Sequence, residues 1–445
     1  MNPPAATPPH DFTGKRMSFS DDLNHPNEEL DQTNVPLLLR PSYARSKSII
    51  FDELRNFRIS LKWCALDHSS SIGKLISFVL FVFLTILVPL FSSLCIQVPA
   101  SSPDDDPISF NKLVNIPESG LAIIGFFSLS CFFRRYGLRQ LLLLDELQED
   151  SAYVRSRYAR ELEKAFRHLT YIILPSFFLE LVHKIIFFSN VKISVAHISA
   201  GFPLNSIVFV LALVSWVYRT GVFLLVCVLF RLTCELQNLR FEGLHKLFEG
   251  CGSDAGVIFR EHVRIKRQLS VTSHRYRFFI IGCLVTMTVS QFGALLMVLA
   301  SKYDKTFFNS GDLMICSAVQ LSGVFLCLIG ATRITHRAQG IVSIATRWHM
   351  LATNARAESE QGKTQVPDAI GSSDTDSDPS DVYVSVTTQQ ASSFQTRQAL
   401  VTYLQHNHRG ITLYGYALDR GLLHTLFAFE FSLVMWILSK VVVLS

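Results

Sequence analysis

Charged residues are scarce in this sequence of 445 residues. Asp, Glu, Lys and Arg make up 17% of the chain, whereas hydrophobic residues make up 49%. An ordinary soluble domain carries roughly 25% charged residues. The apolar residues also come in long blocks, such as LISFVLFVFLTILVPLF, which starts at Leu75. Too little polar surface remains to cover a water-facing protein of this length, so the composition predicts a membrane protein.

The sequence also lacks the motifs of common enzyme classes. It contains no G-x-S-x-G elbow, no P-loop, no H-E-x-x-H zinc motif and no glycine-rich dinucleotide turn. The nine Cys form no C-x-x-C pair and lie mostly in apolar stretches, which is typical of small core residues. We therefore expect no enzyme activity, no metal site and no cofactor. The net charge of +5 is spread along the chain, so no nucleic-acid partner is expected either.

Seven apolar stretches are long enough to cross a bilayer, which takes about 20 mostly apolar residues. They cover residues 75–98, 116–133, 168–189, 203–230, 278–300, 313–332 and 422–444. The second stretch is the weakest, because it is short and opens with Pro117 and Glu118. The sequence predicts an all-α membrane protein with seven transmembrane helices and the lipid bilayer as its partner.

Lys and Arg predict the orientation, because they are enriched in the cytosolic segments of membrane proteins. With the N-terminus inside, four cytosolic segments hold 34 of the 41 Lys and Arg residues, and the three outside loops hold four. The C-terminus is then expected to be extracellular. This topology is the reverse of that of a G-protein-coupled receptor, which also crosses the membrane seven times.

The segments outside the spans predict a further division of the chain. Residues 1–50 lack apolar periodicity and are expected to form a disordered cytosolic tail. The membrane domain covers 51–355. It is expected to continue into the cytosol as helices at 138–167, 231–248, 257–277 and 333–354. Residues 356–392 are rich in Ser, Asp and Thr and predict a disordered loop. In the last part, 393–445, a cytosolic helix leads into the seventh span.

Ionisable residues inside the spans are the best pointers to function, because a charge in lipid is costly unless it is paired or hydrated. Glu180, His183 and Lys184 share one face of the third span at i, i+3 and i+4. They predict either a self-neutralised Glu180–Lys184 pair or the lining of an outward-facing ligand cavity. Arg219, deep in the fourth span, needs a partner, with Glu180 and Glu430 as candidates. A structural ion pair and a place in the ligand cavity both stay open for Arg219.

The arrangement of the spans resembles the insect odorant and gustatory receptor superfamily, with long cytosolic helical extensions and almost no tail after the last span. The local sequence is similar to plant gustatory-receptor-like membrane proteins, a family described mainly as a domain of unknown function. Three stretches carry the resemblance: RRYGLRQLLLLDEL from Arg134, RLTCELQNLRFEGL from Arg231, and LHTLFAFEFSLVMWILSKVVVL from Leu423. The resemblance covers about residues 50–445, apart from the Ser- and Asp-rich loop.

Insect receptors form tetrameric ligand-gated cation channels in which the seventh span lines the pore. The resemblance implies a homo-oligomer with the same scaffold and a small-molecule ligand among spans three to six. It also implies a plasma-membrane location, with an endomembrane as the alternative. If Glu430 faces the pore, helical spacing adds four apolar residues to the same face. These are Phe427, Val434, Ile437 and Val441. An apolar ring of this kind can gate by dewetting.

Two other functions stay open. In the insect receptors the last span carries a Thr-Tyr pair and a Gln-Phe pair. Here Leu426 stands in place of the Tyr, and Ser432 and Leu433 stand in place of Gln-Phe. This departure favours a non-conducting scaffold or signalling regulator whose cytosolic helices recruit partners. A transporter would depend on charged residues such as Glu180 and Arg219, but the sequence shows no internal symmetry between its halves.

Overall fold

The structure is a computed structural model, and all elements below belong to one compact unit within residues 46–445. It describes residues 71–97, 108–141, 150, 152–190, 192–193, 204–249, 254–300, 307–363 and 380–443. The predicted tail, 1–50, lies outside the described residues.

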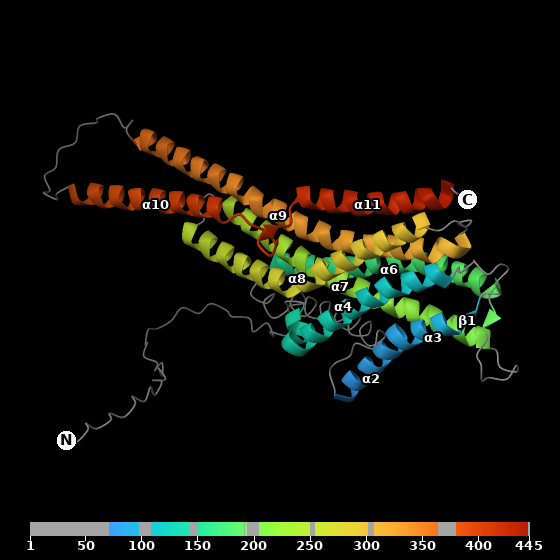
Figure 1. Ribbon diagram of the computed structural model, residues 1–445. Coiled ribbons are helices and arrows are strands. Elements are labelled where there is room, and N and C mark those ends of the chain that lie inside the picture. The colour runs from blue at the N-terminus through green and yellow to red at the C-terminus, as the bar shows by residue number, and fades with distance from the viewer. Residues whose placement is uncertain are drawn as a thin grey trace, which may run out of the picture. The chain divides into compact units, whose positions relative to one another are not determined.

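Helices make up most of the described chain (Figure 1). They are α2 (Ser71–Val82), the π-helix η2 (Phe83–Leu87), α3 (Val88–Cys95), α4 (Ile108–Leu141), α6 (Ala152–Asn190), α7 (Leu204–Glu249), α8 (Ala255–Ala300), α9 (Phe307–Lys363), α10 (Ser380–His406) and α11 (Arg420–Val443). Two antiparallel strand pairs join them: β1 (Ile96–Gln97) with β2 (Lys192–Ile193), and β3 (Thr412–Leu413) with β4 (Tyr416–Ala417). Among the described residues, seven helical segments are long and apolar enough to span a membrane, which confirms the predicted fold class.

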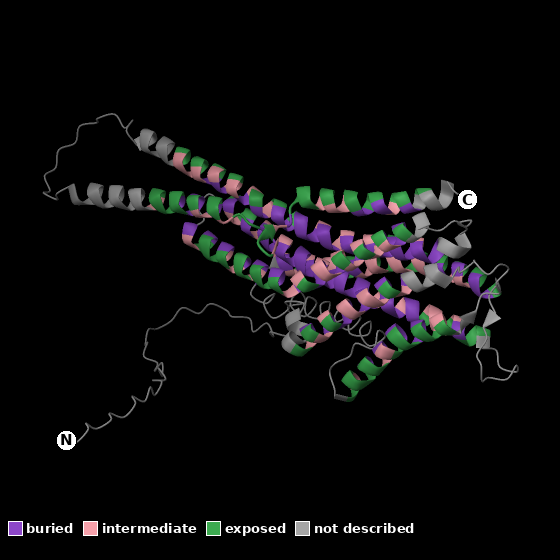
Figure 2. Cartoon of the chain, viewed as in Figure 1, coloured by how far each residue is buried: buried purple, intermediate pink, exposed green. Residues whose placement is uncertain are grey.

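The central helix of the bundle is α7, which packs against α4, α6, α8 and α9. Every side chain from Val222 to Phe230 is buried. A helix that is apolar on all sides belongs in the interior of a bundle. Figure 2 shows the contrast with α2, where exposed apolar side chains include Ile72 and Phe78. Apolar side chains exposed on a membrane span are expected to face lipid.

A π-turn interrupts the first span at η2. The backbone N–H of Val88 bonds to the carbonyl of Phe83, five residues back, instead of to that of Leu84. The Leu84 carbonyl is therefore free to accept a hydrogen bond from the Ser215 hydroxyl of α7, at 2.6 Å. This bond attaches the first span to the central helix.

Three helices continue far beyond the length that a bilayer requires. α7, α8 and α9 contain 46, 46 and 57 residues, against roughly 20 for one crossing. They confirm the helical extensions predicted at 231–248, 257–277 and 333–354. Of the helix predicted over 138–167, α4 includes the residues up to Leu141 and α6 those from Ala152, while 142–149 and 151 lie outside the described residues.

The disordered loop predicted at 356–392 is too wide at both ends. α9 continues to Lys363 and α10 begins at Ser380, while residues 364–379 lie outside the described part of the chain. The helix that precedes the seventh span ends at His406, and the β3–β4 hairpin follows it. The hairpin turn places Tyr414 at φ 49° and Gly415 at φ 92°. Two successive positive φ angles are what a two-residue type I′ turn requires.

Ion pairs fix the helical extensions to one another. The buried Asp150 carboxylate, between α4 and α6, accepts the guanidinium of Arg240 on α7 at 2.9 Å and also that of Arg264 on α8. Glu242 on α7 pairs with Arg157 on α6 at 2.7 Å. A buried carboxylate without a cation would be strongly destabilising, so Asp150 depends on its two arginines. Through these pairs α6, α7 and α8 are joined beyond the predicted spans.

Candidate functional site

Arg219 on α7 forms a buried ion pair with Glu118 on α4. The Nη2 atom of Arg219 lies 3.0 Å from Oε2 of Glu118, and the two side chains are 5% and 8% exposed. The Nη1 atom of Arg219 donates to Oδ1 of Asn115 at 3.1 Å and to the hydroxyl oxygen of Ser119 at 3.3 Å. One face of α4 thus surrounds a guanidinium placed deep in a predicted span.

The partners predicted for Arg219, Glu180 and Glu430, are both wrong. Glu430 on α11 accepts a hydrogen bond from the Thr288 hydroxyl of α8, and Glu180 belongs to a separate group of charges on α6. Glu118 is the only acidic residue of the predicted second span. An acidic residue within a span needs a cation or a proton. The position of Glu118 could therefore have identified it as the partner of Arg219.

A second group of charges joins α6 to α9. Nζ of Lys184 lies 2.5 Å from Oδ2 of Asp312 and 3.3 Å from Oε1 of Glu180. Nδ1 of His183 lies 2.5 Å from the other carboxylate oxygen of Asp312. The predicted pair between Glu180 and Lys184 is confirmed. Asp312 was missed, because it comes one residue before the predicted sixth span and reads as part of a loop.

Gly311 allows the imidazole of His183 to lie directly against α9. A Cβ atom at position 311 would come within 2.5 Å of Cδ2 and 3.0 Å of Nε2 of His183. Contacts that short do not occur, so no larger residue fits without displacing the ring. His183, Glu180 and Asp312 are 0%, 1% and 7% exposed. This group of charges is therefore enclosed by protein.

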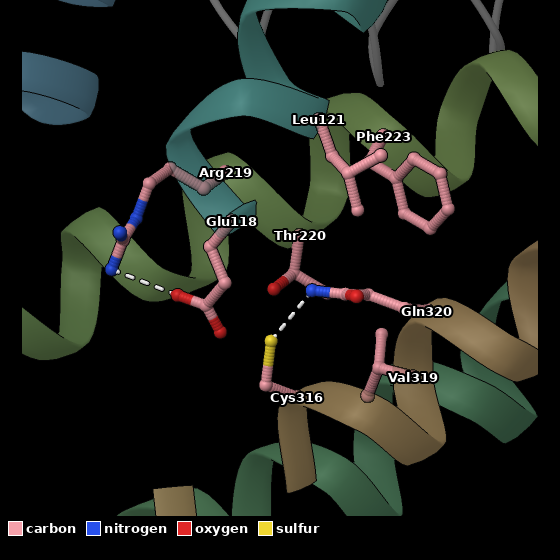
Figure 3. A pocket seen from close by; sticks show the side chains of 8 residues that line it. All are labelled: Glu118, Leu121, Arg219, Thr220, Phe223, Cys316, Val319 and Gln320. Atoms are coloured by element: carbon pink, nitrogen blue, oxygen red, sulfur yellow. Dashed lines mark hydrogen bonds and ion pairs between the residues drawn. The ribbon is translucent and has the colours of Figure 1, made fainter. Parts of the chain in front are cut away.

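A small cavity of about 20 Å³ adjoins the Arg219–Glu118 pair. Figure 3 shows its lining from α4, α7 and α9: Glu118, Leu121, Arg219, Thr220, Phe223, Cys316, Val319 and Gln320. Polar groups lie on one side, where Gln320 donates to the Cys316 sulfur, and apolar side chains lie on the other. At this volume the cavity has room for about one water molecule. Its lining offers both polar and apolar groups, but a larger molecule can enter only if the surrounding helices move apart.

Of the four residues predicted to line a ligand cavity, Arg219 borders this one. Glu180, His183 and Lys184 lie in the neighbouring charge group and are not among its lining residues. The two groups interact electrostatically, because Glu118 lies within range of both Lys184 and Asp312. The site therefore consists of a cavity on one side of Glu118 and a closed charge group on the other.

The predicted pore residues lie on the side of α11 that packs against α8 and α9. Glu430 and Ile437 are 2% and 3% exposed, and Phe427 and Val434 are half-buried. The ring of Phe427 packs on that of Phe325 of α9, with centroids 4.7 Å apart. The side chain of Val441 lies outside the described residues.

The opposite side of α11 is exposed and carries small residues along its centre. This stripe consists of Gly421, Thr425, Ala428, Ser432 and Ser439, and the larger Met435 interrupts it. Larger apolar side chains flank it, among them Phe429 and Trp436, at 45% and 48% exposed. Within the single chain, the exposed side of α11 is therefore small and partly polar at its centre and apolar at its edges.

Comparisons with known proteins place this architecture in a family and beside solved structures. The model of the family described as Protein of unknown function (DUF3537) matches residues 52–429. The insect olfactory receptor OR5 from Machilis hrabei is similar in fold, with a TM-score of 0.54 and 11% sequence identity, covering 87% of this chain and 98% of the receptor. The same receptor in complex with eugenol gives a TM-score of 0.48 at 11% identity, covering 84% and 91%. No curated protein matches the sequence.

Proposed function

Because this chain belongs to the family of unknown function DUF3537 and shares the fold of an insect olfactory receptor, we propose that it is a chemoreceptor-like, ligand-gated cation channel. The proposal assigns ligand binding to the cavity beside Arg219 and ion conduction to α11 in an oligomer of this chain. The observation that carries it is the buried Arg219–Glu118 pair beside a cavity within the predicted spans.

Charge placement supports a ligand site at the cavity. Two ionised side chains inside lipid are costly, and a purely structural contact between α4 and α7 could be made by apolar residues at no such cost. The guanidinium of Arg219 and the amide of Gln320 offer donors, Glu118 offers acceptors, and Phe223 and Leu121 offer apolar surface. The matching ligand class is a small amphipathic molecule that carries a hydrogen-bonding group, and α4, α7 and α9 must move apart to admit it because the cavity of about 20 Å³ holds only about one water molecule.

The shape of α11 supports a pore on its exposed side. Large apolar residues would be expected throughout a side that meets only lipid, yet small and hydroxylated residues such as Ala428, Ser432 and Ser439 occupy its centre. Small residues permit close approach between helices, and hydroxyl groups can line a hydrated path. We therefore assign the pore lining to the stripe on α11 and not to the Glu430 side, which would require the helix to rotate by about half a turn.

Exposed apolar side chains beyond the predicted spans support assembly from several copies. Phe259 and Val263 on α8, and Met350 and Leu351 on α9, are 41–60% exposed. They lie on the helical extensions, where the bilayer would not cover them. A second copy of the chain would bury this surface, as large exposed apolar patches commonly indicate. The tetramer that the resemblance implies would bury this surface between its subunits.

The full-length chain in lipid nanodiscs provides the test. A photo-crosslinking amino acid at Ser432 is expected to join copies of the chain, whereas the same group at Ile76, exposed on α2, is expected to react with lipid. Particle images are expected to show rotational symmetry. In planar bilayers, the chain is expected to pass cations, and Ser432→Arg is expected to reduce the cation current by placing positive charge in the pore. Monomeric particles without adducts at Ser432 would instead support the non-conducting scaffold.

The proposal also includes an orientation in the membrane and a cellular location for the chain. We place the N-terminus and the α10 end in the cytosol and the C-terminus outside, at the plasma membrane. A protease added to intact cells is expected to remove a tag after Ser445 and to spare a tag before Met1. The reverse result would place the proposed ligand cavity on the other face of the membrane.

A further inference from the structure

We propose that Glu180, His183 and Asp312 form a binding site for a divalent transition-metal ion such as Zn²⁺, and that the Lys184 ammonium occupies this site when no metal is bound. The site lies beside the proposed ligand cavity and shares no lining residue with it. Whether the chain conducts ions therefore does not bear on whether this site binds metal.

The donor set is that of a metal site. One ligand atom from each of Glu180, His183 and Asp312 lies within 4.8 Å of the other two. Glu180 and His183 form a Glu-x-x-His pair on α6, the i, i+3 spacing by which bundle helices present ligands to a metal. An imidazole with two carboxylates suits Zn²⁺ and its first-row neighbours better than Ca²⁺ or Mg²⁺. The sequence alone predicts no metal site, because Asp312 lies far along the chain from the other two residues.

An unsatisfied carboxylate oxygen is the second observation. Oε2 of Glu180 is fully buried and has no hydrogen-bond partner among the described residues, while its Oε1 lies 3.3 Å from Lys184. A buried acceptor without a donor costs about 1–3 kcal/mol, and more when it is charged. A metal ion bound beside this oxygen would remove the penalty.

Two different cations can stabilise the carboxylates of the site. Without a metal, the Lys184 ammonium faces the carboxylates of both Glu180 and Asp312. With a divalent ion in place, the same two carboxylates balance the charge of the ion once the ammonium withdraws. Lys184 can withdraw, because its side chain is 15% exposed and is long enough to extend towards the membrane surface.

For Zn²⁺ to bind, the side chains of His183 and Asp312 must move apart. Nδ1 of His183 and Oδ1 of Asp312 lie 2.5 Å apart, whereas two ligands on one tetrahedral Zn²⁺ lie about 3.4 Å apart at the usual bond lengths. The two groups must separate by roughly an ångström. The imidazole is held by Gly311, so the carboxylate of Asp312 is the group that turns.

The test is a Zn²⁺ titration of the purified full-length chain by calorimetry, with Co²⁺ spectra as a report of the ligands. We expect about one Zn²⁺ to bind per chain. Glu180→Gln and Asp312→Asn are expected to weaken binding by about tenfold or more. His168→Gln, an exposed His on the same helix, is expected to leave binding unchanged.

Lys184→Met separates the proposal from a simple loss of folding. Without its ammonium the carboxylates are unbalanced, so this variant is expected to unfold at a lower temperature than the wild type. Zn²⁺ is expected to bind it about tenfold more tightly and to restore its melting temperature. Absence of Zn²⁺ binding to both the wild type and Lys184→Met would overturn the proposal, as would binding that depends on His168 and not on Asp312.

Discussion

The hydroxyl of Ser119 on α4 donates a hydrogen bond to the backbone carbonyl of Thr85 in the π-turn, at 3.0 Å. In a regular helix the N–H of residue 89 would bond to that carbonyl, but residue 89 is Pro and has no N–H. The oxygen of Ser119 also accepts a hydrogen bond from Arg219. The defect in the first span is thereby connected through one hydroxyl to the charged pair of the proposed ligand site.

Ser119→Ala is expected to lower the stability of the folded chain by about 0.5–2 kcal/mol, because it leaves the Thr85 carbonyl and one Arg219 N–H without a partner. The matched control is Ser128→Ala on the same helix, whose hydroxyl only bonds back to the carbonyl of Ile124. Thermal unfolding in detergent measures both. Equal melting temperatures for the two variants would show that the link to the π-turn carries no energy.

Glu118 and Arg219 are expected to behave as a coupled pair. Arg219→Met leaves a buried carboxylate without a cation, which is expected to cost about 3–5 kcal/mol. The double variant Arg219→Met with Glu118→Leu is expected to recover most of that loss, because no buried charge remains. A double-mutant cycle on melting temperature checks this prediction. Additive effects of the two changes would mean that the charges are solvated separately.

Local features of the sequence were enough to predict the membrane helices and one of the charged contacts, that between Glu180 and Lys184. Seven spans follow from apolar length, and the contact of Glu180 with Lys184 follows from their i, i+4 spacing. The partners of Lys184 and Arg219 could not be predicted in this way. Asp312 and Glu118 lie on other helices, 128 and 101 positions away along the chain. Only the packing of the bundle determines which helices become neighbours.

The side of α11 that faces the other helices could not be predicted from the sequence, for a different reason. Hydrophobicity is distributed almost evenly around this helix, so no pronounced polar face indicates which residues meet the protein. Glu430 was the single charged marker near its centre, and its carboxylate accepts a hydrogen bond from the Thr288 hydroxyl within the bundle. A lone charge in an apolar helix identifies a contact, but it does not reveal whether the contact is a pore or a neighbouring helix.

Acid is expected to loosen the contact between α8 and α10. Burial and the nearby Lys266 lower the pKa of His262 to about 4, and the imidazole packs edge-on against Tyr403 of α10, with centroids 5.5 Å apart. The unfolded His titrates near pH 6.5, so the unfolded state binds more protons between those two values. Stability from this group is therefore complete above pH 6.5 and falls as the pH decreases towards 4.

Hydrogen exchange along α10 at a series of pH values measures this effect. Exchange in residues 393–406 is expected to accelerate between pH 6.5 and 4 in the wild type. His262→Gln removes the titrating group, so its exchange is expected to change less over the same range. Identical pH profiles for the two proteins would place the acid sensitivity elsewhere.

Two glycine substitutions are expected to change stability in opposite directions. A Cβ at Gly410, ahead of the β3–β4 hairpin, would lie 2.5 Å from the backbone Cα of Thr335 on α9. Gly410→Ala must therefore push the hairpin off α9, at a cost of about 1–3 kcal/mol. Gly340, in the middle of α9, has nothing within 4 Å of such an atom, so Gly340→Ala is expected to stabilise the helix by about 0.5–1 kcal/mol.

The β3–β4 hairpin connects α10 to α11, the helix to which we assign the pore, so the effect of Gly410→Ala bears on the position of α11. If Gly410→Ala displaces it, hydrogen exchange should increase in 407–419 and at the start of α11, while α2 stays protected. Gly340→Ala should raise the melting temperature without altering exchange in the hairpin. A Gly410→Ala variant as stable as the wild type would mean that the hairpin does not need to lie against Thr335, and α11 would then be free to move independently of α9.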